Sequence, residues 1–69
     1  MTGTALPPPD FDALEAALTH GLSIDTHHDR AYLVEDGRCL GVTVFKDYPS
    51  RSAAAKHLVW AVLKNLGWL

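Results

Sequence analysis

Two adjacent histidines, His27 and His28, are the side chains of this chain best suited to chemistry. A free imidazole titrates near neutral pH, so it can accept a proton from an RNA 2′-hydroxyl or hydrogen bond to it. Asp25 and Asp29 flank the pair and complete a set of metal-ligand types. Neighbouring strand residues point to opposite faces, however, so we predict neither a metal site nor a cofactor. The simpler alternative is a polar surface loop.

A second candidate site lies at the start of a predicted C-terminal helix, where Ser50, Arg51 and Lys56 supply donors and positive charge. The first N–H groups of a helix lack partners and carry partial positive charge, which suits a phosphate. Such contacts would follow the shape of an RNA helix rather than its sequence. The alternative is a capped helix start that faces only solvent.

Three aromatic side chains are candidates for binding a protein partner. Trp60 lies opposite the apolar stripe of the predicted helix, with a lysine four residues away on each side. Tyr32 and Phe45 fall on one face of the predicted sheet. The alternative for Trp60 is that the N-terminal tail or the first helix covers it.

The composition is that of one small soluble domain with an uneven charge distribution. The 69 residues are 48% hydrophobic and 20% charged, and no apolar run approaches the roughly 20 residues that span a membrane. The single cysteine, Cys39, excludes an internal disulfide, so we expect a cytoplasmic protein. Net charge is −2, yet residues 37–69 carry five basic residues and one acid. One face could therefore be basic although the whole is acidic.

The elements that must position these residues follow from local patterns. Residues 1–9 include three consecutive prolines and predict a flexible tail, and residues 10–69 predict a single domain. A first helix is expected over 11–20, with Asp10 as N-cap and Phe11, Leu14 and Leu18 at helical spacing. A short strand over 22–26 and a polar loop over 26–30 follow.

The Asp36-Gly37 pair predicts a two-residue type I′ hairpin turn. Pairing outward from that turn sets Val34 opposite Cys39 and Leu33 opposite Leu40. Ser50 and Gly67 then bound a second helix. The expected fold is α+β, an α-β-β-β-α two-layer sandwich with a three-stranded antiparallel sheet and two helices on one face. The apolar residues left on the other face predict a homodimer or a protein partner.

Three stretches resemble the double-stranded-RNA-binding domain over about residues 28–66. His28 precedes the aromatic Tyr32 by four positions, Gly37-Arg38-Cys39-Leu40-Gly41 follows the turn, and residues 50–56 open an alanine-rich helix. The Gly-Pro that the family places before the loop histidine is absent. The resemblance implies the fold above and non-catalytic binding of structured RNA through residues 27–28, Ser50, Arg51 and Lys56.

A second resemblance is to HicA-type toxin ribonucleases, which share that fold. It is carried by Thr26-His27-His28, Asp36-Gly37-Arg38 and Leu63-Lys64-Asn65-Leu66-Gly67, although the family's glycine before the histidine is missing. It implies RNA cleavage that depends on His27 or His28. We therefore expect RNA binding first, a protein-interaction module acting through the sheet face or Trp60 second, and a ribonuclease third.

Overall fold

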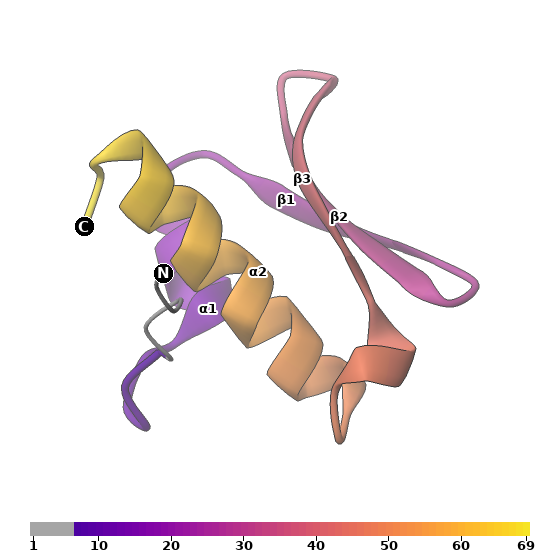
Figure 1. The fold of residues 1–69 in the computed structure, drawn as a ribbon. Helices are drawn as coiled ribbons and strands as arrows, with labels where there is room; N and C mark the ends of the chain where they lie inside the picture. Colours follow the sequence, from indigo (N-terminus) through magenta and orange to yellow (C-terminus); the bar gives the residue numbers. More distant parts are fainter. Residues whose placement is uncertain (1–6) are drawn as a thin grey trace.

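The computed structural model describes residues 7–69, and these form an α+β fold of two layers (Figure 1). The elements run α1, β1, β2, β3, the 3₁₀ helix η1 and α2. Their bounds are Ala13–Thr19, Ser23–His27, Arg30–Glu35, Arg38–Val44, Phe45–Asp47 and Arg51–Leu66. The predicted α-β-β-β-α topology is confirmed, and it is consistent with a double-stranded-RNA-binding-domain-like fold. Residues 1–6 of the predicted tail lie outside the described residues.

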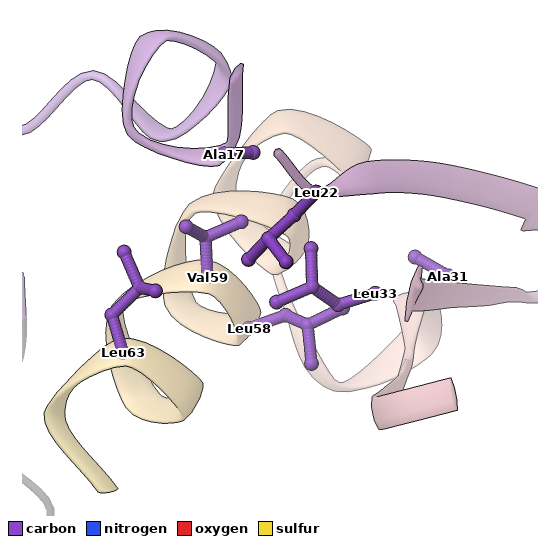
Figure 2. Close-up of a cluster of buried hydrophobic side chains, with 7 residues drawn as sticks. All are labelled: Ala17, Leu22, Ala31, Leu33, Leu58, Val59 and Leu63. Carbon is purple, nitrogen blue, oxygen red and sulfur yellow. The ribbon is translucent and has the colours of Figure 1, made fainter. Parts of the chain in front are cut away.

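The sheet is antiparallel in the order β1-β2-β3, so β2 is central and β1 and β3 are the edges. Figure 1 shows both helices on the same side of this sheet. Side chains from that side of the sheet and from both helices meet in the core (Figure 2). Its buried members are Ala17, Leu22, Ala31, Leu33, Leu58, Val59 and Leu63.

The first helix begins later than predicted, and its N-cap is Asp12 rather than Asp10. The Asp12 carboxylate accepts a hydrogen bond of 3.1 Å from the Glu15 N–H. Ahead of it, the Phe11 N–H donates to the Pro8 carbonyl at 3.0 Å in a turn that precedes the helix. Because residues 8–11 form this turn, their backbone cannot also form the first turn of a helix that begins at residue 11.

The buried face of α1 is made of alanine. Ala17 is fully buried, whereas Leu14 and Leu18 are 64% and 69% exposed. The small side chains let α1 approach α2 closely, because they add little bulk between the two backbones. The leucine spacing thus indicated a helix correctly, but the leucines lie on its solvent side.

The predicted loop over 26–30 is a tight hairpin instead. The strand β1 continues through His27, which lies opposite Arg30, so only His28 and Asp29 form the turn. His28 has a φ of 56°, the left-handed conformation that a short turn requires and that few non-glycine residues adopt.

The second hairpin confirms the predicted turn but shifts its register after two pairs. Asp36 and Gly37 have φ angles of 52° and 79°, and Val34 lies opposite Cys39 as expected. A bulge then sets Leu33 opposite Gly41 rather than Leu40. The predicted pairing of Leu33 with Leu40 is therefore wrong, because β3 has one more residue than β2 at this point.

The bulge reverses which residues of β3 face the helices. Gly41 faces α2, where a Cβ would stand 2.8 Å from Val62 Cγ2. Val42 instead lies opposite Tyr32 on the open face and is 51% exposed. Leu40, within the bulge, packs against the core. At this point of β3 the residue that faces the helices is a glycine, which admits α2.

Candidate nucleic-acid interface

The β1–β2 turn and the start of α2 meet at Phe45. The Phe45 N–H donates to the Asp29 carbonyl at 2.8 Å, and the Arg51 guanidinium lies 4.8 Å from the centre of the Phe45 ring. Phe45 therefore contacts both the turn and the helix start, and Figure 1 shows η1 between the β1–β2 hairpin and the first turn of α2. We call the polar residues that flank this junction along the chain the turn–helix patch: His27, His28, Arg30, Lys46, Ser50 and Arg51.

The two histidines of the patch are exposed and lie against each other. Their ring centroids are 4.6 Å apart, with 22° between the ring planes. His27 ends β1 and His28 occupies the turn, so the stacked pair stands at the tip of the hairpin. Stacking keeps both rings together at the surface, where their nitrogens can reach hydroxyls or phosphate oxygens of a ligand.

The start of α2 has the geometry of a capped helix. The Ser50 hydroxyl accepts a hydrogen bond of 3.0 Å from the Ala53 N–H, and the Ser50 carbonyl accepts one of 3.1 Å from the Ala54 N–H. The N–H groups of Arg51 and Ser52 precede the first intrahelical bond, so they remain available to an anion. The predicted N-cap is confirmed.

The turn–helix patch carries a small excess of positive charge. Arg30, Lys46 and Arg51 stand against Asp29 and Asp47, all of them exposed. Arg30 lies 3.8 Å from Asp29, but both side chains are more than half exposed, so solvent screens this pair. The patch is therefore weakly basic in a chain whose net charge is −2.

The Lys56 side chain contacts the N-terminal segment rather than the turn–helix patch. Its ammonium donates to the Pro9 carbonyl at 2.9 Å, which ties the second turn of α2 to the N-terminal segment. Four of the five residues predicted to bind nucleic acid thus flank the Phe45 junction along the chain, and the fifth is held against Pro9.

The aromatic candidates lie in three different environments. The Trp60 ring makes an edge-on contact with Phe11, with centroids 5.1 Å apart, and Lys64 Nζ lies 5.5 Å from its centre. Phe45 has left the sheet for η1, where it packs against the core. Tyr32 alone of the three stays on the open sheet face, opposite Val42.

One pair of polar residues has no signal in the sequence. Tyr48 Oη lies 2.7 Å from His57 Nδ1 in a partly buried hydrogen bond. Both residues line an open groove of about 480 Å³ between β3 and α2. The eight residues between them include the start of α2, so no local spacing indicates the contact. Arg30 and Lys46 gave no such signal either, because only the fold brings the backbone of the β1–β2 turn to Phe45.

Within residues 7–69, no three His, Cys, Asp or Glu side chains are grouped so that they could hold a metal ion. None of the helices described is both long and apolar enough to cross a membrane. No family model matches the chain, and neither does any curated protein or solved structure. The function must therefore be argued from the surfaces of the molecule itself.

Proposed function

We propose that this domain binds structured RNA, without cleaving it, through the turn–helix patch. The observation that supports the proposal is the Phe45 junction, where the backbone of the histidine turn and the Arg51 side chain at the start of α2 contact the same residue. Groups suited to phosphate and groups suited to hydroxyls therefore flank one junction.

Each part of the patch has a role that its chemistry suits. The first N–H groups of α2 and the Arg51 guanidinium bind phosphate oxygens. Arg30 and Lys46, next to Asp29 and Phe45 in the chain, add positive charge near the junction. His27 and His28 reach the 2′-hydroxyls that the wide minor groove of an RNA duplex displays. Binding of this kind reads the shape of RNA and distinguishes it from DNA.

Fluorescence anisotropy with a labelled RNA duplex of about 20 base pairs tests the proposal. With three cations on phosphates, the logarithm of affinity should fall with the logarithm of salt concentration with a slope of about −3. Arg51→Ala should make that slope shallower by about one unit. Arg38→Ala is the matched control, because Arg38 begins β3 at the opposite end of the strand from η1. A DNA duplex of the same sequence should bind more weakly.

Lys56 provides a second comparison. Its ammonium already donates to the Pro9 carbonyl, so Lys56→Ala should change the salt slope less than Arg51→Ala does. Equal binding of RNA and DNA, or equal loss in the Arg51 and Arg38 variants, would contradict the proposed site. Cleavage of the RNA that disappears in His27→Ala or His28→Ala would instead favour a ribonuclease.

A second candidate function is protein interaction through the open sheet face. Tyr32 and Val42 lie opposite each other there, and Val42 is 51% exposed although its side chain is apolar. Both helices cover the other face, and exposed apolar sheet surface commonly marks a partner site. Absence of RNA binding at low salt would leave this candidate as the better account of the domain.

A further inference from the structure

The outer edge of β3 lacks the devices that usually protect an edge strand. Within residues 7–69 the strand pairs only with β2, and it carries no charge and no proline from Cys39 to Val44. Its bulge lies near the turn, so residues 41–44 remain regular. The other edge, β1, is shorter and carries Asp25 and His27. Natural edges generally use charge, proline or short length to prevent pairing, and β3 uses none of them there.

The backbone of β3 offers hydrogen-bonding groups to a further strand. Phe45 donates to Asp29, and the next pair along the ladder is Val44 with Arg30. Because inward and outward groups alternate in an antiparallel pair, Val42 and Val44 direct their N–H and C=O groups to the outer edge. Two N–H donors and two C=O acceptors on the outer edge of β3 are therefore available to a further strand.

An apolar groove runs beside this edge. It has a volume of about 480 Å³ and lies between β3 and α2. Gly41 forms part of its wall, and Leu66, 43% exposed, is an accessible apolar side chain beside it. A strand paired with β3 would pack its side chains against this groove and remove apolar surface from water.

The two ends of β3 carry opposite charge. At the turn end, Glu35 and Asp36 outnumber Arg38, which lies 3.6 Å from Glu35. At the other end, Arg30, Lys46 and Arg51 outnumber Asp29 and Asp47 by one. Antiparallel pairing of two copies brings the negative end of each beside the positive end of the other, and this happens twice by symmetry.

We propose that β3 pairs with β3 of a second copy of this chain, antiparallel about a two-fold axis at Val42. The product is a continuous six-stranded sheet with the uncharged residues of both strands at its centre. This inference does not depend on RNA binding, since it uses the edge of β3 and not the histidine turn. An edge contact of this size is small, so the dimer should form with a dissociation constant on the order of micromolar.

Sedimentation velocity of the full chain over a range of concentrations tests the pairing. Wild type should shift from monomer to dimer, and high salt should weaken the dimer because opposite charges meet at its ends. Val42→Lys and Val42→Glu should each weaken it by about tenfold or more, since the axis sets each new charge against its own copy. An equimolar mixture of the two variants should restore the dimer. Val42→Thr is the uncharged control and should behave as wild type does.

Loss of the dimer can be distinguished from loss of the fold, because Val42 is half exposed and circular dichroism reports whether each variant keeps its structure. Amide hydrogen exchange distinguishes edge pairing from contact through the open face. The Val42 and Val44 amides should become protected as concentration rises. A wild-type chain that stays monomeric at several hundred micromolar overturns the proposal. So does a dimer in which these two amides exchange as in the monomer.

Discussion

At Gly41 a single hydrogen atom decides how closely β3 and α2 can pack. An added Cβ would stand 2.8 Å from Val62 Cγ2 and 3.1 Å from Leu58 Cδ1. Val62 is β-branched, so its side chain has little rotational freedom within a helix, and Leu58 is only 5% exposed. The glycine is therefore needed for space rather than for an unusual φ.

We predict that Gly41→Ala lowers the free energy of unfolding by about 1–3 kcal/mol, because the helix must shift to admit the methyl group. Chemical denaturation monitored by circular dichroism measures the change. Val62→Ala made in the Gly41→Ala background should recover part of the loss, since it removes the obstructing methyl groups. An unchanged unfolding midpoint in Gly41→Ala would mean that β3 and α2 are not packed as closely as described.

Among the elements, α2 combines a structural and a functional role at its first turn. The Ser50 hydroxyl caps the helix at the place where the proposed site offers N–H groups to phosphate. Its other end is closed by Gly67, with a φ of 77°, and by a hydrogen bond of 2.9 Å from the Trp68 N–H to the Leu63 carbonyl. The helix is thus held at both ends by local interactions.

Two substitutions of Ser50 should separate these roles. Ser50→Ala should lower the free energy of unfolding by about 1 kcal/mol through loss of the cap. Ser50→Asp keeps a capping oxygen, so stability should stay near that of wild type, but its charge should weaken RNA binding by repelling phosphate. Denaturation and anisotropy on the same preparations measure both effects. RNA binding by Ser50→Asp equal to that of wild type would place the phosphate site away from the helix start.

For the whole molecule, stability depends on a small core beneath one face of the sheet. Leu33, Val59 and Leu63 are its largest fully buried side chains (Figure 2). A domain of this size is expected to have roughly 3–5 kcal/mol of stability, so any one of them accounts for much of it.

Leu33→Ala should therefore cost roughly 2–5 kcal/mol and leave a large part of the population unfolded at 25 °C. Leu18→Ala is the matched control, because Leu18 is 69% exposed on α1 and should change stability by less than about 0.5 kcal/mol. Thermal unfolding followed by circular dichroism compares the two. Similar losses in both variants would contradict the alanine-faced packing of α1.

Features that depend only on neighbouring residues could be predicted from the amino-acid sequence. The Asp36-Gly37 turn, the Ser50 cap and the end of α2 at Gly67 each follow from the conformation or hydrogen bonding of a few adjacent residues. Together with the order of helical and strand patterns, they were enough to predict the α-β-β-β-α topology.

Which side chains meet depends on tertiary packing and could not be predicted from local patterns. The bulge at Leu40, which exposes Val42, arises because Gly41 must face α2, and no rule of the hairpin requires it. The Phe45 junction and the Tyr48–His57 hydrogen bond join elements whose distance in space is set by packing. The spacing of apolar residues predicts a helix, but which of its side chains are buried depends on how closely the backbones of two packed elements can approach. For that reason the alanines of α1 are inside and its leucines outside.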